Sequence, residues 1–66
     1  LEKLSNREIE ITKLLVEGFS NIEICHALKI KKSTVSTFKN RIFEKLEVES
    51  LSSLIQLFNF YKDKNE

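Results

Sequence analysis

Apolar residues recur along this chain at intervals of three and four, which is the spacing of one face of an α-helix. Four stretches show this spacing, and polar residues typical of helix ends separate them. The pattern predicts an all-α chain with helices over residues 6–17, 21–28, 33–46 and 51–61. The charged tail after the last of them, residues 62–66, is expected to fray.

The starts of the first two helices carry the same signal. Ser5 is followed three residues later by Glu8, and Ser20 by Glu23. In such a capping box the serine oxygen accepts a hydrogen bond from a backbone N–H of the first turn, and the glutamate accepts one from the backbone N–H of the serine. The only glycine, Gly18, stands where the first helix should end. Glycine commonly supplies the left-handed residue that closes a helix.

The apolar faces of the predicted helices should pack into one shared core. The fourth helix carries more apolar residues than the core of so small a domain needs, since Leu57, Phe60 and Tyr61 continue its apolar face round the side. An exposed apolar patch often marks an interface, although these residues could equally close the core. The other residues expected in the core are Leu4, Ile11, Leu14, Leu15, Ile24, Cys25, Leu28, Val35, Phe38, Ile42, Phe43, Leu46, Leu51, Leu54, Ile55 and Phe58.

The link between the second and third predicted helices is very short, from about Lys29 to Lys32. Helices joined by so few residues cross at a large angle, which predicts a helix-turn-helix in which Ile30 fills the angle. The third helix should begin at Ser33 or at a residue just before it.

Small polar residues stand at the starts of both helices of this unit. Ser33 and Thr34 place hydroxyls and free backbone N–H groups where the helix dipole is positive, and Ser20 and Asn21 do the same one helix earlier. Such a helix start can bind a phosphate. Capping alone would also account for these residues, and it is the commoner reason for serine at a helix start.

Charge is concentrated in the third predicted helix and the turn before it. Between Lys29 and Lys45 there are six basic residues and one acid, Glu44, whereas residues 1–28 and 46–66 are both net acidic, so the total of +1 hides a polarised molecule. One face of the third helix is apolar, and the opposite face can donate and accept hydrogen bonds. A polyanion is the expected partner, although a solvated amphipathic helix would show the same two faces. The polar face comprises Ser36, Thr37, Lys39, Asn40 and Arg41.

Composition excludes several classes of protein. The chain of 66 residues makes one domain at most, and it has no apolar run long enough to span a membrane. The single cysteine, Cys25, cannot form an internal disulfide, and with one histidine, His26, it cannot build a zinc site. We expect no metal and no cofactor, and the paired acid, base or nucleophile groups of an enzyme are missing too. These features suit a reducing, cytoplasmic setting.

Three strings of the sequence run in order through the chain: LSNREIEITKLLVEGFSNIEI, ALKIKKSTVSTFKNRIFEKLEV and SLSSLIQL. Together they resemble the DNA-binding domain of the LuxR-type transcription factors, in the form found at the C-terminus of NarL- or BvgA-like response regulators. The resemblance runs without a gap from about Leu4 to Phe58. It implies a compact four-helix domain whose second and third helices form the helix-turn-helix. It also implies binding of double-stranded DNA at a promoter, as a dimer on an inverted repeat.

The resemblance further implies the partners of a two-component response regulator. These are an N-terminal regulatory domain, which controls the DNA-binding domain, and RNA polymerase. The chain begins at Leu1 without a methionine, which suggests a domain excised from a longer regulator. Processing, or the boundary of a fragment, would look the same.

Carried over residue by residue, the resemblance assigns roles to the third and fourth helices. The base-reading positions fall on Ser36, Thr37 and Asn40, and asparagine can pair with adenine through two hydrogen bonds. The contact between two copies of the domain falls on Leu51, Ile55 and Asn59. The backbone-contacting positions fall on Ser20, Asn21, Lys32, Ser33 and Thr34, with Lys39, Arg41 and Lys45 added by their charge alone, although Lys45 could merely complement the helix dipole.

Three positions depart from the pattern of the family. Ile22 stands where a lysine is frequent, so one cationic contact to the DNA backbone is expected to be missing. Lys29 and Glu47 replace glycines that are common in the turn and after the third helix. If the backbone still needs a positive φ there, each replacement costs on the order of 1 kcal/mol.

A helical protein-interaction module is the alternative to DNA binding. In that case the basic third helix would dock an acidic protein. A steep loss of duplex-DNA affinity as salt rises, with tighter binding to an inverted repeat, would favour DNA recognition. A partner that bound equally well with Lys32, Lys39 and Arg41 all neutralised would point elsewhere. RNA binding has less support, because the aromatic residues lie on predicted core faces and offer no platform on which bases could stack.

Overall fold

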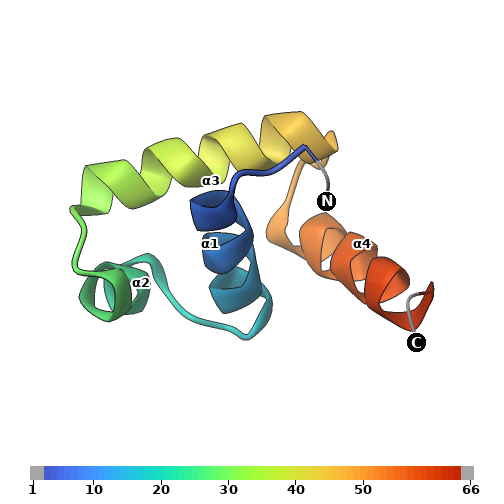
Figure 1. Cartoon of the computed structure of the whole chain (residues 1–66), viewed down its shortest axis with the longest axis horizontal. Coiled ribbons are helices and arrows are strands. Elements are labelled where there is room, and N and C mark those ends of the chain that lie inside the picture. Colours follow the sequence, from blue (N-terminus) through green and yellow to red (C-terminus); the bar gives the residue numbers. More distant parts are fainter. Residues whose placement is uncertain (1–2, 65–66) are drawn as a thin grey trace.

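The computed structural model describes residues 3–64, with side chains described over residues 3–60. Four α-helices follow one another in this part of the chain (Figure 1): α1 over Asn6–Val16, α2 over Asn21–Leu28, α3 over Lys32–Leu46 and α4 over Leu51–Lys64. The described residues include no β-strand. The predicted all-α, four-helix fold is therefore confirmed.

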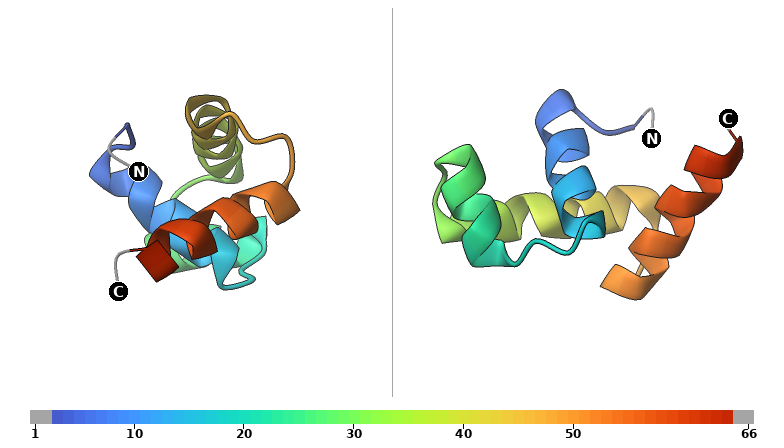
Figure 2. Two further views of the ribbon diagram at one scale, coloured as in Figure 1. Left: turned by 90° about the vertical axis from the view of Figure 1, so that its right-hand side faces the viewer. Right: turned by 90° about the horizontal axis from the view of Figure 1, so that it is seen from below.

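The longest helix, α3, runs along one side of the molecule, and the other helices pack beneath it (Figure 1). Seen from below, α1 crosses α3 near its middle, α2 lies at the start of α3 and α4 lies near its end (Figure 2). Packing contacts join α3 to α1 and to α2, and α1 to α4. Only three residues, Lys29 to Lys31, link α2 to α3, which makes these two helices the helix-turn-helix expected from the sequence.

The core lies where the inward faces of all four helices meet. Its buried apolar residues are all among those expected from the apolar spacing, and Phe38, Phe43 and Leu46 pack around them half-buried. Two polar residues, Glu8 and Thr12, are buried as well, with exposed fractions of 2% and 0%, and the apolar pattern did not predict them. The buried apolar residues are Leu4, Ile11, Leu15, Ile24, Val35, Ile42 and Leu54.

Both predicted capping boxes are present. Ser5 N–H donates to Glu8 Oε1 at 2.8 Å while Glu8 N–H donates to Ser5 Oγ at 3.2 Å. Ser20 and Glu23 form the same pair of bonds at the same two distances. These bonds satisfy N–H groups that the first turn of a helix leaves without a partner.

The helix bounds differ slightly from those predicted. The first helix ends at Val16 instead of residue 17, because Glu17 forms its C-terminal cap. The third begins at Lys32 instead of residue 33, with Lys31 as its N-cap. The fourth continues to Lys64, beyond the predicted end at residue 61. The side chain of Tyr61, predicted to extend an apolar face, lies outside the described residues.

Three helices end in the same way, with one residue at positive φ. Gly18 has a φ of 100°, while the two non-glycine residues, Lys29 and Glu47, have φ values of 56° and 55°. After Glu47 the N–H of Val48 donates to the carbonyl of Phe43 at 3.0 Å, which is the bond that closes a helix through a left-handed residue. The two positions where the resemblance led us to expect glycine therefore keep a left-handed backbone, and a side chain there is strained.

Replacing Glu47 by glycine should therefore stabilise the domain by about 0.5–1 kcal/mol, since glycine relieves the strain and loses part of that gain to a more flexible unfolded chain. Urea unfolding followed by circular dichroism measures the change. Glu47→Gln is the control, because it removes the charge from the end of α3 and keeps the side chain. If Glu47→Gln stabilised the domain as much as Glu47→Gly, the charge and not the backbone would be the cause.

Candidate nucleic-acid interface

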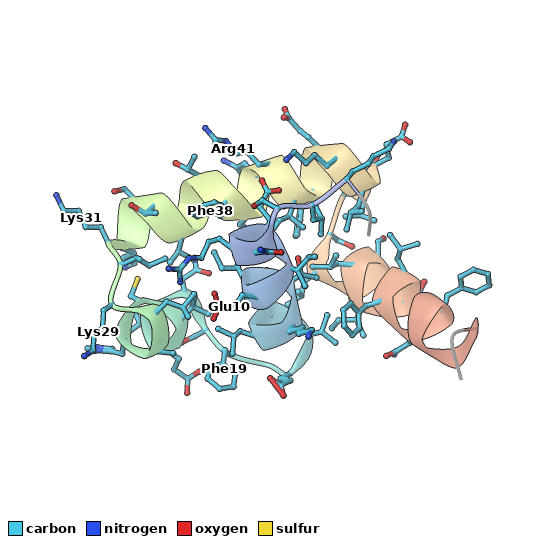
Figure 3. The ribbon with its side chains drawn as sticks, in the orientation of Figure 1. Glu10, Phe19, Lys29, Lys31, Phe38 and Arg41 are labelled. Atoms are coloured by element: carbon cyan, nitrogen blue, oxygen red, sulfur yellow. The ribbon has the colours of Figure 1, made fainter. Side chains whose placement is uncertain are left out.

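The outward face of α3 is polar and exposed. Val35 and Ile42 are fully buried on the inner face of the helix, whereas the side chains of Ser36, Thr37 and Asn40 are all exposed on the other face. Figure 3 shows the same division, with Phe38 on the side of α3 that meets the rest of the domain and Arg41 on the side that points away from it. The three residues expected to read bases therefore share one accessible surface.

These three side chains differ in their hydrogen bonds. Thr37 Oγ1 donates to the backbone carbonyl of Ser33, one turn earlier, at 3.0 Å. The side chains of Ser36 and Asn40 have no hydrogen bond to any of the residues that the structure describes. The Ser36 hydroxyl and the Asn40 amide therefore keep all their donors and acceptors available, whereas the hydroxyl hydrogen of Thr37 is already used.

Cations flank this polar face. Lys32 and Arg41 are exposed, and Lys39 is half-buried. The ammonium of Lys39 lies 5.8 Å from the centre of the Phe43 ring, within the range of a cation–π contact. Lys29 and Lys31 project from the turn between α2 and α3 (Figure 3). The basic residues predicted from charge thus form a rim around the exposed face of α3.

The start of α3 has no side-chain cap. Lys31 occupies the N-cap position and its side chain makes no capping bond, whereas serine side chains accept backbone bonds at the starts of α1, α2 and α4. The first helical bond runs from Val35 N–H to the carbonyl of Lys31. The amides of the residues from 32 to 34 therefore have no partner in the described part of the chain. Ser33, considered above as a possible cap, is not one, because the helix starts before it.

Ser20 at the start of α2 is a cap, which reduces what it can offer to a phosphate. Its oxygen accepts from Glu23 N–H, and its own N–H donates to the Glu23 carboxylate. The hydroxyl hydrogen of Ser20 and the first-turn amides of Asn21 and Ile22 remain available. The predicted backbone contact at this helix start can use those three donors and the side-chain amide of Asn21. Ile22 is 54% exposed, in the place where the family often has lysine.

Lys45 is engaged inside the domain. Its Nζ donates to Oε1 of Glu8 at 2.8 Å, joining α3 to the start of α1. The Lys45 ammonium beside Glu8 holds the pKa of that carboxyl below its ordinary value of 4.5, and the N–H of Ser5 acts in the same direction against the effect of burial. This bond competes with the predicted phosphate contact of Lys45, whose side chain is 40% exposed. Lys45 also does more than complement the dipole of α3, because its partner is a buried carboxylate.

On α4, the residues expected at a contact between two copies lie on one face. Leu51, Ile55 and Asn59 follow one another at intervals of four, the spacing of a helical face. Leu51 is 38% exposed, Ile55 is half-buried and Asn59 is exposed, while Leu54 is buried in the core. Phe60, predicted to extend the apolar surface, is 60% exposed.

The described residues contain no group of three or more His, Cys, Asp or Glu side chains that could hold a metal ion. Cys25 is half-buried and has no disulfide partner, and His26 is exposed. None of the helices in the described range has both the length and the apolar character needed to cross a bilayer.

Comparison with known proteins agrees with this geometry. The family described as "Bacterial regulatory proteins, luxR family" matches residues 2–58. The chain is 44% identical over 54 residues to the virulence-factor transcription regulator BvgA of Bordetella pertussis, and 41% identical over 54 residues to the DNA-binding transcriptional activator EvgA of Escherichia coli. Each match covers 82% of this chain and 26% of the relative.

A third relative, the fimbriae Z protein of Escherichia coli, is 42% identical over 59 residues, which cover 89% of this chain and 28% of the relative. The chain thus spans about a quarter of the length of the curated relatives that it matches. No solved structure gave a significant match.

Proposed function

Because this chain belongs to the luxR family of bacterial regulatory proteins, we propose that it binds double-stranded DNA in a sequence-specific way and thereby controls transcription. The family is one of regulators and not of enzymes. The observation that carries the proposal is the exposed face of α3, where Ser36, Thr37 and Asn40 are accessible and cations flank them. Regulators of this kind act in the cytoplasm, where the DNA is.

In this proposal α3 lies in the major groove. The groove is about 12 Å wide and admits one α-helix. The outward face of α3 is free to enter the groove, because Val35 and Ile42 hold the inner face of the helix against the rest of the domain. Ser36, Thr37 and Asn40 would then meet base edges, which carry the sequence information.

Phosphate contacts would surround this helix. Lys32, Lys39 and Arg41 are placed to reach the DNA backbone on either side of the groove, and the unpaired amides at the start of α3, including those of Ser33 and Thr34, are placed to donate to a phosphate. The start of α2 adds the donors of Ser20 and Asn21. These contacts supply most of the affinity and position the domain without selecting a sequence.

Binding to random duplexes at several salt concentrations tests the proposal most directly. A pool of random duplexes is titrated with this chain at several salt concentrations, and the bound duplexes are sequenced. We expect affinity to fall steeply with salt, because binding releases counterions from the DNA, and we expect an inverted repeat among the bound sequences. If no duplex binds, and an acidic protein surface binds at the same ionic strength, the alternative of a protein-interaction module replaces DNA recognition.

We also propose that two copies bind the inverted repeat and meet through α4. Leu51, Ile55 and Asn59 form a partly apolar strip on α4, beside the buried Leu54 and partly exposed. Such a contact repeats the same surface on both copies, as a two-fold axis requires. The strip is small, so the dimer should be weak in solution and stronger on DNA.

Ile55→Glu should abolish this self-association, since it places two buried carboxylates across the two-fold axis. Analytical ultracentrifugation, with and without an inverted-repeat duplex, measures the result. Gln56→Glu is the matched control, because residue 56 is exposed and adjacent to this strip but not on it. Unchanged self-association of the Ile55→Glu protein would remove α4 from the interface.

The proposed regulator would be the output part of a two-component system. The relatives extend well beyond the matched segment, which makes up 26% to 28% of their length. A regulatory domain N-terminal to this segment and a contact with RNA polymerase are the partners that such a regulator would use.

A further inference from the structure

The hydrogen bonds on the outward face of α3 limit which bases it can accept. Thr37 donates its hydroxyl hydrogen to the carbonyl of Ser33, so only its oxygen lone pairs and its methyl group face outward. Glu44, one turn beyond Asn40 on the same face, is exposed and its carboxylate has no partner among the described residues. Thr37 and Glu44 can therefore accept hydrogen bonds from a base but cannot donate them.

Guanine suits this face poorly. In the major groove guanine presents two acceptors, N7 and O6, and no donor, whereas adenine and cytosine present an amino group and thymine a methyl group. Arginine and lysine are the side chains that commonly donate to guanine. On α3 they lie at the rim: Lys39 precedes Asn40 and Arg41 follows it, so that the helical period turns them to opposite sides.

Asn40 has the one fixed pair of donor and acceptor on this face. Its exposed amide has no hydrogen bond within the described residues, so its NH₂ can donate to adenine N7 while its oxygen accepts from adenine N6. The Ser36 hydroxyl also has no partner in the described part of the chain, but it rotates freely and can either donate or accept. Ser36 therefore discriminates little between the four bases.

We propose that α3 selects duplexes that place adenine against Asn40 and excludes guanine from the base against Thr37. This inference rests on the proposed function, since it concerns what the same face recognises. The target class is a half-site in which the contacted bases offer amino or methyl groups, and in which no guanine faces the centre of α3.

Two variants that keep the shape of the side chain test the inference. Asn40→Asp also adds a negative charge, which should weaken binding to all duplexes alike, so its readout is the order of base preference. Asn40→Asp keeps the shape and removes the donor, and a carboxylate prefers the amino group of cytosine. Its preferred base should therefore change from adenine to cytosine at one position. Thr37→Val keeps the branched shape and the outward methyl group but removes the oxygen that repels guanine. It should relax discrimination against guanine at a single, different position.

The measurement is competition binding on a set of duplexes that differ at one base pair each, starting from the best sequence selected from a random pool. For the unaltered chain, exchanging the adenine against Asn40 for guanine should weaken binding about 10-fold or more. A merely structural role of either residue would weaken binding to all duplexes equally, with no change in the order of preference. Circular dichroism confirms that both variants are folded.

Three results would overturn the inference. The first is a guanine preferred at either position by the unaltered chain. The second is uniform loss of affinity in both variants. In both cases the chain still binds duplex DNA, so the proposed function stands. The third is absence of binding to any duplex, which would overturn the proposed function together with this inference.

Discussion

Replacing Lys32, Lys39 and Arg41 together by glutamine should weaken duplex binding on the order of 10²-fold at about 0.15 M salt. The three side chains flank the outward face of α3, and each is placed to neutralise a phosphate. For each phosphate that is no longer neutralised, binding releases one counterion fewer. The slope of log affinity against log salt should therefore become shallower by about 2 to 3. The order of preferred sequences should stay the same, because these residues do not face base edges in the proposed complex.

The chain offers a matched control for this variant. Lys3, Arg7 and Lys13 are likewise two lysines and one arginine, all three are exposed, and they lie on or just before α1 and not on α3. Replacing them by glutamine removes the same charge from a different surface. Fluorescence anisotropy with one labelled duplex compares the two variants over a range of salt. Equal losses of affinity would mean that only the net charge matters, and the assignment of the α3 rim would be wrong.

Much of the fold could be predicted because its signals are local. The capping boxes at Ser5 and Ser20 place two helix starts within a few residues, and Gly18 places one helix end. The outward position of Ser36 and Asn40 follows from the helical period once Val35 and Ile42 are assigned to the core. These inferences need no knowledge of how the helices pack.

The start of α3 was less predictable. Ser33 and Thr34 are good capping residues, yet Lys31 occupies the cap position without a capping bond. The positive φ of Lys29 closes α2 and sends the chain directly into α3. The short link itself was expected, but the first residue of α3 lies one position earlier than the capping residues indicate.

The direction of the Thr37 hydroxyl is also a property of the folded helix. A threonine on a helix can bond to the carbonyl one turn earlier, and Thr37 does so with Ser33. The sequence identifies Thr37 as a possible base-reading residue but leaves open whether it can donate. The structure shows that it only accepts, and this difference is the basis of the inferred exclusion of guanine.

The pair formed by Glu8 and Lys45 could not be predicted for a different reason. The capping box alone accounts for a glutamate at position 8, whether or not it is buried, and Lys45 lies 37 residues away in sequence. The helical spacing nevertheless indicated that Glu8 is buried. Glu8 and Thr12 fall at the same helical spacing as Ile11 and Leu15, so the apolar face of α1 passes through both of them.

Glu8→Gln should destabilise the domain by about 2 kcal/mol, the scale of a hydrogen bond to a charged group. Glutamine keeps the size of the side chain and can still accept from Ser5 N–H, but it loses the ionic bond to Lys45 at 2.8 Å. The loss stays below that of a fully buried pair because Lys45 is 40% exposed and water can solvate it. Since a chain of this length has about 3 to 10 kcal/mol of stability in total, the variant should unfold at a clearly lower urea concentration.

Glu23→Gln is the control for this experiment. Glu23 forms a capping box with Ser20 whose two distances equal those of Ser5 and Glu8, but Glu23 is exposed and no lysine among the described residues contacts it. Its replacement should cost no more than about 0.5 kcal/mol, as a neutral acceptor still caps the helix. If both variants lost the same stability, the capping bond alone would explain the effect and the bond to Lys45 would contribute nothing.

The same pair should make the stability of the domain depend on pH. The pKa of Glu8 is lower in the folded chain than its ordinary value of 4.5, chiefly because of the hydrogen bond from Lys45. A group with a lowered folded pKa stabilises the fold fully above its unfolded pKa, and this stability is lost as the pH falls through the folded value. Urea unfolding of the unaltered chain should therefore show stability falling below about pH 4.5, and Glu8→Gln should remove part of that decrease. If the stability of Glu8→Gln decreased at low pH as much as that of the unaltered chain, another carboxylate would cause the acid sensitivity. Protonation of Glu8, and loss of its bond to Lys45, would then not be the cause.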